Sequence, residues 1–364
     1  MGMLFVPYSA WGHVAPMLAV VAELTARGIA VRVLAGSAYR GAVESVGAVA
    51  VVPEVEHEVR VPAECGPAAW AERGRLRYQR RIAWATTEVA LIRELRTDPP
   101  DVCVVDPHMP WAHRIAIRSG AAVVRLWTTH ARRSRGNMPV LVNALRELQP
   151  ARWRFGQEVH FVGPLNGFAG PLNGFAPEGA DTEIAELAGL EGPLLVVAPG
   201  TVFERSATYF RGIAEAFAGS EWTVLLATAW LPVPEVGTLP ENVLARQWIP
   251  QSAVLRRADV FLTHAGMNSV QESLLAGVPM LLAPRSREQR QTAARLRALG
   301  VGQSLHCDGG VVQQALRLAS DPLVRKGLQL IQARMPESSG KVRAADLLLE
   351  IADPVGSTRS WRTP

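Results

Sequence analysis

The chain has 364 residues, of which 48% are hydrophobic and 20% are charged, and a formal net charge of +5. This composition supports a large buried core, and a domain size of roughly 100–200 residues predicts about two domains. It argues against disorder, and no apolar run reaches the roughly 18 residues of a transmembrane helix.

Short apolar runs alternate with helical patterns along the first half of the chain. Strands are predicted at residues 4–8, 30–35, 49–52, 102–105 and 122–126. Helices are predicted at residues 16–27, 38–46, 68–96 and 111–119. Strands that alternate with helices of this length predict right-handed βαβ units around a parallel sheet.

The same alternation restarts after residue 190, with strands predicted at residues 194–198, 223–227, 243–247, 260–263 and 279–283. Residues 194–198 are apolar throughout, which is typical of a parallel strand that is buried on both faces. Between the halves, the turn-forming heptapeptide Gly-Pro-Leu-Asn-Gly-Phe-Ala occurs twice in tandem from Gly163.

We therefore expect an α/β chain of two facing Rossmann-like, doubly wound domains with an interdomain cleft. The predicted boundaries are an N-terminal domain at residues 1–162, a linker at 163–180 and a C-terminal domain at 181–364.

Cysteine usage and the N-terminus favour a cytoplasmic location. Cys65, Cys103 and Cys307 lie far apart and form no C-x-x-C motif. The first residues lack the charged and long apolar regions of a signal peptide. Arginine clusters at residues 73–81 and 132–135 favour solvated surface, with an acidic or membrane-bound acceptor as the alternative. Tyr78 is the one aromatic residue within them, which is not the interleaving that a nucleic-acid platform requires, so no nucleic-acid partner is expected.

A strand–turn–helix pattern at residues 260–272 predicts an anion site. The strand ends at Thr263, Gly266 lets a phosphate approach the backbone, and a helix begins around Asn268. The first turn of a helix offers unpaired N–H groups and the positive end of its dipole. His264 and Ser269 add donors, and Glu272, one turn further, could accept from ribose hydroxyls.

Each of these residues also has an ordinary explanation when taken alone. His264 could be a structural histidine, Asn268 or Ser269 a helix cap, and Glu272 a solvated helix residue. A second phosphate loop is predicted at Gly200-Thr201, after the first strand of the second half, where a plain βα turn is the alternative.

The N-terminal half offers a candidate general base. The loop Tyr8-Ser-Ala-Trp-Gly-His-Val-Ala-Pro follows the first strand, and Pro16 places His13 at or just before the helix start. Asp106 ends the strand at 102–105 and should emerge at the same sheet edge, where its carboxylate could fix the imidazole tautomer. An ordinary loop histidine and a turn-capping aspartate are the alternatives. His108 and His113 are nearby without a metal-ligand spacing.

Residues 248–289 resemble the nucleotide-sugar signature of the inverting glycosyltransferases with two Rossmann-like domains (GT-B type). The matches are W-I-P-Q-S-A-V-L from Trp248, T-H-A-G-M-N-S-V-Q-E from Thr263, then G-V-P and E-Q. Met267 stands where plant members usually carry tryptophan, so the resemblance is closer to bacterial antibiotic glycosyltransferases. It implies a donor site at Gly200, Thr201, Trp248, Pro250, Gln251, His264, Gly266, Asn268, Ser269, Glu272, Glu288 and Gln289.

The resemblance also implies that the N-terminal domain binds the acceptor, that the C-terminal domain binds the donor, and that the matched residues have individual roles. Trp248 would stack on the base, with Pro250 and Gln251 lining its pocket. The diphosphate would lie against His264, Gly266 and Ser269, with Asn268 near the sugar and Glu272 on the ribose. Glu288 and Gln289 would contact sugar hydroxyls, although the family usually has aspartate before that glutamine.

The implied reaction is transfer of a sugar, by our preference a deoxysugar, from a dTDP- or UDP-sugar to a small natural-product aglycone, with inversion. His13 and Asp106 would form the base dyad. The sequence has no D-x-D motif, so neither a metal nor a cofactor beyond the nucleotide sugar is expected. An apolar acceptor pocket or ordinary core packing could each account for Trp11, Trp70, Trp84, Trp111 and Trp127.

The sequence also leaves other functions to consider. A sugar-nucleotide epimerase or hydrolase could share this layout, and so could a silent partner that activates another glycosyltransferase. A dinucleotide dehydrogenase is disfavoured, because the first strand is not followed by G-x-G-x-x-G. No integral membrane segment is expected, a lipid acceptor would imply peripheral membrane contact, and a homodimer is compatible with the sequence.

Overall fold

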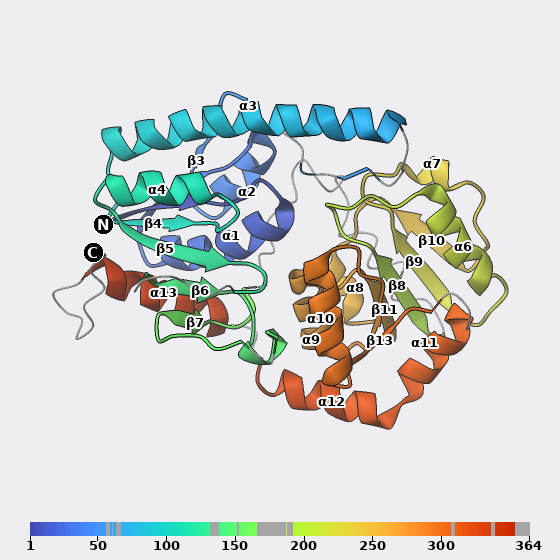
Figure 1. The fold of residues 1–364 in the computed structure, drawn as a ribbon. Helices are drawn as coiled ribbons and strands as arrows, with labels where there is room; N and C mark the ends of the chain where they lie inside the picture. Colours follow the sequence, from blue (N-terminus) through green and yellow to red (C-terminus); the bar gives the residue numbers. More distant parts are fainter. Residues whose placement is uncertain are drawn as a thin grey trace. The chain divides into compact units, whose positions relative to one another are not determined.

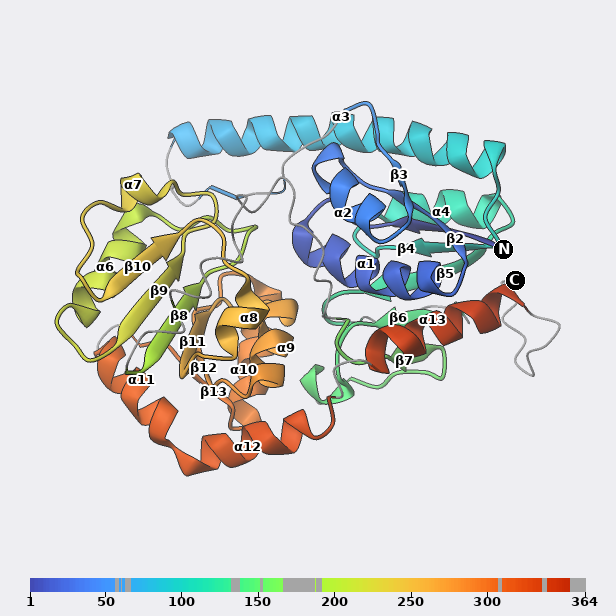
Figure 2. The same cartoon turned by 180° about the vertical axis from the view of Figure 1, so that it is seen from behind.

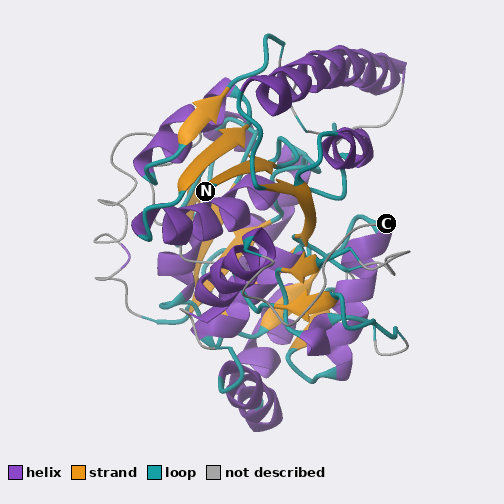
Figure 3. Cartoon of the chain, turned by 90° about the vertical axis from the view of Figure 1, so that its left-hand side faces the viewer, coloured by secondary structure: helices purple, strands orange, loops and turns teal. Residues whose placement is uncertain are grey.

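The computed structural model describes residues 1–55, 59, 61–62, 67–131, 138–150, 153–165, 187, 192–306, 310–335 and 339–353. The chain forms two compact units (Figure 1). Unit 1 comprises Met1–Val59, Ala71–Gly174 and Pro336–Pro364, and unit 2 comprises Arg60–Trp70 and Phe175–Met335. In the described parts of both units, helices flank the strands (Figure 3).

Unit 1 contains a seven-stranded parallel sheet in the order β3-β2-β1-β4-β5-β6-β7. Its strands are β1 (Gly2–Val6), β2 (Ala30–Leu34), β3 (Val49–Val51), β4 (Val102–Val105), β5 (Ala122–Trp127), β6 (Val140–Val142) and β7 (Val159–Phe161). The helices are α1 (Trp11–Ala26), α2 (Arg40–Ser45), α3 (Pro67–Thr97, in this unit from residue 71), α4 (Pro110–Arg118) and α13 (Ser339–Ala352). Short 3-10 turns occur at Ser37–Tyr39 and Arg146–Leu148.

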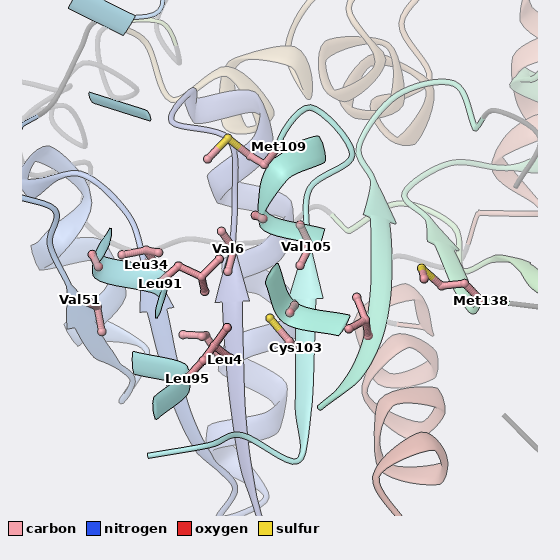
Figure 4. Packing of buried hydrophobic residues seen from close by; sticks show 14 residues of the cluster. Leu4, Val6, Leu34, Val51, Leu91, Leu95, Cys103, Val105, Met109 and Met138 are labelled. Atoms are coloured by element: carbon pink, nitrogen blue, oxygen red, sulfur yellow. The ribbon is translucent and has the colours of Figure 1, made fainter. Parts of the chain in front are cut away.

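Successive side chains of each strand point to opposite faces of the sheet, so unit 1 has a part of its core on each face. Leu4 and Val6 of β1 pack with Leu91 and Leu95 of α3 on one face (Figure 4). Right-handed crossovers in opposite directions from β1 and β4 place α1 and α4 on opposite faces, as Figures 1 and 2 show. Each fully buried aliphatic side chain contributes about 1.5–3 kcal/mol.

The last described helix, α13, belongs to unit 1 and packs beside α1. The Arg27 guanidinium pairs with Asp346 at 2.5 Å. Residues 60–70 belong to unit 2, where Val61 bridges Phe203. The units therefore differ from the predicted division at 1–162 and 181–364. Of the predicted linker, only residues 163–165 lie within the described part of the chain.

Unit 2 contains a six-stranded parallel sheet in the order β10-β9-β8-β11-β12-β13. Its strands are β8 (Leu194–Ala198), β9 (Thr223–Ala227), β10 (Val243–Arg246), β11 (Val260–Thr263), β12 (Met280–Leu282) and β13 (Gly302–Ser304). Its helices are α6 (Ala207–Phe217), α7 (Val233–Val236), α8 (Gln251–Leu255), α9 (Met267–Ala276), α10 (Arg287–Ala298), α11 (Val311–Ser320) and α12 (Pro322–Gln332).

In both sheets the strand order reverses direction next to the first strand of the unit. The reversal lies between β1 and β4 in unit 1 and between β8 and β11 in unit 2. Open α/β sheets bind their ligands at the carboxyl ends of the strands at such a switch point. None of the helices within the described ranges is both long and apolar enough to cross a membrane.

Candidate functional site

His13 and Asp106 meet at the switch point of unit 1. The pairing of Val6 with Val105 brings the carboxyl ends of β1 and β4 together. His13 lies in the first turn of α1, which begins at Trp11, earlier than the predicted residue 16. The His13 Nδ1 atom lies 2.7 Å from Asp106 Oδ2 and 3.0 Å from the Thr128 hydroxyl. Because an ionised carboxylate only accepts, Nδ1 carries the proton and Nε2 remains able to accept one.

Asp106 also holds a second histidine. Its Oδ1 atom accepts from the backbone N–H of His108 at 2.8 Å and lies 3.0 Å from the His108 Nδ1 atom. Burial alone would raise the pKa of this carboxyl, but His13 and His108 outweigh it and hold the pKa well below its ordinary value. Asp106 is therefore ionised and bridges two imidazoles. A backbone N–H that donates to an aspartate two residues earlier, as His108 does to Asp106, is typical of an Asx turn. The sequence Asp106-Pro-His108 could therefore have indicated this contact.

The ligand atoms of His13, Asp106 and His108 lie within 4.8 Å of one another. These are the residues, among those described, that could hold a metal ion. The same contacts also suit proton transfer, because the carboxylate orients both rings and stabilises positive charge on either of them.

Aromatic side chains surround this group. The Tyr8 ring lies 5.3 Å from His13 and 5.8 Å from His108, and the Trp127 ring lies 6.2 Å from His108. Burial raises the pKa of the Tyr8 phenol, which the nearby Arg80 partly opposes. Trp127, one of the predicted acceptor residues, thus lies against the group formed by His13, Asp106 and His108.

The other four predicted acceptor tryptophans have different surroundings. Trp84 and Trp111 pack against the hydrophobic core on the α3 and α4 face. Trp11 stacks on Tyr39 with ring centroids 6.3 Å apart. Trp70 is 65% exposed and belongs to unit 2.

In unit 2, the His264 ring lies between two glycines at the switch point. A Cβ on Gly200 would lie 2.5 Å from the ring Cε1 atom, and one on Gly266 would lie 2.3 Å from Nε2. Gly200 also has a φ of +85°, which favours glycine. Burial lowers the pKa of His264 to about 4, partly opposed by a hydrogen bond with Ala198, so the ring is neutral at pH 7.

The helix that follows has the features expected of an anion site. α9 begins at Met267, one residue earlier than predicted, and its N-cap Gly266 offers no side-chain cap. The first-turn residues Asn268 and Ser269 are thus at its N-terminus. Ala265, with a φ of +64°, is a non-glycine residue in the left-handed region, a strain that clusters at functional sites.

Glu272 belongs to a buried polar network. The Gln251 Nε2 atom donates to Ser269 Oγ at 3.2 Å and to Glu272 Oε2 at 2.6 Å, which joins α8 to α9. Burial raises the pKa of Glu272 to about 7, opposed by hydrogen bonds from Gln251 and Ser252. This environment argues against the alternative of a solvated helix residue.

Trp248 and Thr201 are linked by Trp230, a residue that sequence reasoning missed. The Trp230 and Trp248 rings meet edge to face with centroids 5.8 Å apart. The Trp230 Nε1 atom donates to the Thr201 carbonyl at 2.5 Å. A signal for Trp230 was present in the sequence. It follows β9, which lies next to β8 in the sheet, so its side chain could be expected near the loop that carries Thr201.

The remaining predicted donor residues lie at helix starts. Pro250 is the N-cap of α8. The Gln289 side-chain oxygen accepts from the N–H groups of Arg285 and Ser286 at 2.7 and 3.1 Å, completing a capping box at the start of α10. Gln289 therefore organises this loop, and Glu288 lies beside it in the same turn.

The fold of the chain is that of GT-B glycosyltransferases, with two Rossmann-like units. The calicheamicin glycosyltransferase CalG4 has a TM-score of 0.75 and 26% identity, over 98% of this chain and 99% of that one. VinC in complex with dTDP has the same fold, with a TM-score of 0.71 and 18% identity over 97% of this chain and 99% of its own.

Residues 134–317, half of the chain, match the family model "UDP-glucoronosyl and UDP-glucosyl transferase", and the chain belongs to this family. Oleandomycin glycosyltransferase of Streptomyces antibioticus is 35% identical over 215 residues, 57% of this chain and 48% of the relative. Demethyllactenocin mycarosyltransferase of Streptomyces fradiae is 31% identical over 222 residues, 59% of this chain and 46% of the relative. The chain thus spans about half the length of these relatives.

Proposed function

We propose that this chain is an inverting, metal-independent glycosyltransferase. It transfers a sugar, preferentially a deoxysugar, from a dTDP- or UDP-sugar to a hydroxyl of a small natural-product aglycone. The observation that carries the proposal is the pairing of His13 Nδ1 with the buried Asp106 carboxylate at 2.7 Å, at the carboxyl edge of a Rossmann-like sheet. The Streptomyces relatives are named for oleandomycin and for demethyllactenocin, and these names support the acceptor class.

In the proposed step, the Nε2 atom of His13 takes the proton of the acceptor hydroxyl, and Asp106 stabilises the imidazolium. The acceptor oxygen bonds to the anomeric carbon as the bond from that carbon to the diphosphate oxygen breaks on the opposite face. The electron pair leaves with the nucleoside diphosphate, whose charge the first-turn N–H groups of α9 stabilise.

The donor would be held by residues of unit 2. Trp248, with Trp230 against its ring, offers an aromatic surface for the base. The network of Gln251, Ser269 and Glu272 offers acceptors for ribose hydroxyls. Gly200 and Gly266 lack the side chains that would collide with the His264 ring, so this ring can lie between the two loops proposed to hold the phosphates.

The proposal is tested by incubating the protein with dTDP- and UDP-hexoses, with and without a panel of hydroxylated polyketides and flavonoids. Mass spectrometry should detect glycosylated product, and release of the nucleoside diphosphate should require the aglycone. Free sugar or an altered sugar nucleotide formed without an aglycone would instead identify a hydrolase or an epimerase. Binding of neither donor would remove the basis of the proposal.

Replacing Glu272 by glutamine should weaken donor binding more at high pH than at low pH. The wild-type pKa of about 7 means that Glu272 is ionised above this pH and protonated below it. Only the ionised form can accept two ribose hydroxyls without a competing proton, so wild type and variant should converge as pH falls. Calorimetric titration at about pH 8 and about pH 6 measures the ratio of their dissociation constants. A ratio that is the same at both pH values would contradict the ribose role.

A further inference from the structure

Arg205 lies outside the matched signature, yet its side chain spans the switch point of unit 2. It lies in the loop between β8 and α6, and its Nη2 atom donates to the Ala283 carbonyl, just after β12, at 2.8 Å. β11, whose loop carries His264, lies between those two strands. The charge of Arg205 reaches His264 and lowers the pKa of its ring further.

The Arg205 guanidinium is fixed by contacts but has no counter-charge within the described part of the chain. It stacks on the Tyr209 ring, 4.4 Å from the centroid, and its Nε atom is buried without a hydrogen-bond partner. No carboxylate pairs with it among the residues that the structure describes, and Arg285 is a second cation that acts on it. Burial lowers the pKa of Arg205, the Tyr209 phenol partly opposes this shift, and Arg285 lowers the pKa further.

A partly buried cation beside a second cation is costly unless an anion completes the site. Arg285 comes from the β12–α10 loop, next to the Ser286 cap and close in sequence to Glu288. Arg205 thus acts electrostatically on His264 and is itself acted on by Arg285, which belongs to the loop that precedes Glu288. Guanidinium groups match phosphate oxygens in a bidentate geometry.

We infer that Arg205 and Arg285 bind the diphosphate of the nucleotide-sugar donor. The inference rests on the proposed function and adds two residues to its donor site. Both guanidinium groups stay protonated through the reaction. They stabilise the negative charge that collects on the diphosphate oxygen when its bond to the anomeric carbon breaks, without transferring a proton.

The test compares wild type with Arg205→Gln and Arg285→Gln, using UDP, dTDP, UDP-glucuronic acid and uridine as ligands. Calorimetry should show UDP and dTDP binding weakened about 10–100-fold by Arg205→Gln, as expected for loss of a charged hydrogen bond. Arg285→Gln should weaken it less, because Arg285 is exposed. Uridine affinity, measured by ligand-observed NMR, should not change. Arg290→Gln, which replaces an exposed arginine of α10, is the matched control.

Retention of UDP and dTDP affinity by both variants would overturn the inference and leave the proposed function intact. A loss confined to UDP-glucuronic acid would also overturn it, because the pair would then recognise a sugar carboxylate. Wild type that binds neither UDP nor dTDP would overturn the proposed function and this inference together. If Arg205→Gln unfolds, the test uses Arg285→Gln and Arg205→Lys instead. Lysine keeps the charge and loses the bidentate geometry, so both variants should bind UDP and dTDP more weakly than wild type, and unchanged affinity in both would overturn the inference.

Discussion

Replacing His13 by alanine is expected to lower kcat for sugar transfer by about 10²–10⁴-fold, the contribution of a positioned general base. The variant loses the Nε2 acceptor that Asp106 orients through Nδ1. Donor binding should not change, because the proposed donor residues lie in unit 2. Steady-state kinetics with a saturating aglycone, together with calorimetric titration of the donor, separates the two effects.

His108→Ala provides the matched comparison, since His108 contacts the other oxygen of the same carboxylate. Its loss should reduce kcat less than the loss of His13. The reverse order would identify His108 as the base, and unchanged turnover in His13→Ala would exclude base catalysis by His13.

Replacing Asp106 by asparagine should lower kcat by about 10²–10⁴-fold, because an amide can donate to Nδ1 and stabilise the wrong tautomer. The shape of the buried side chain is preserved, so circular dichroism and the thermal midpoint check that the fold is intact. The two residues act as one unit, so the double variant His13→Ala/Asp106→Asn should be no slower than His13→Ala alone. A multiplicative loss in the double variant would show that Asp106 acts independently of His13.

The sequence predicted the strands of the central sheets best. Predicted ranges 102–105, 194–198, 223–227 and 260–263 coincide with β4, β8, β9 and β11, because continuous apolar runs define buried parallel strands. β6, β7 and β13, each three residues long, were not predicted. Such short strands carry too little periodicity, and their pairing depends on neighbours distant in the chain.

The start of α1 was misplaced for a different reason. Its N-cap is Ala10, which makes no side-chain hydrogen bond, so the sequence offers no capping signal. Pro16 was therefore interpreted as an early helical residue, although it lies inside the helix.

Within the candidate site, the predictable part was the position of residues after adjacent strands. His13 and Asp106 follow β1 and β4, whose pairing brings them together. The roles of His108, Trp230 and Arg205 depend on tertiary contacts with a carboxylate, a loop carbonyl and an aromatic ring. Gln289 was predicted from the motif as a sugar contact, and the structure adds a second role, because its side chain completes the helix cap of α10.

The association of α13 with unit 1 limits how this chain can be recombined with its relatives. Ala344, Ala345 and Leu348 of α13 are fully buried. A chimera made by one crossover near residue 180 would cover the core of unit 1 with a helix that evolved against another sequence. Exchange of unit 2 therefore calls for two crossovers, the second between α12 and α13, so that α13 stays with the unit 1 against which it packs.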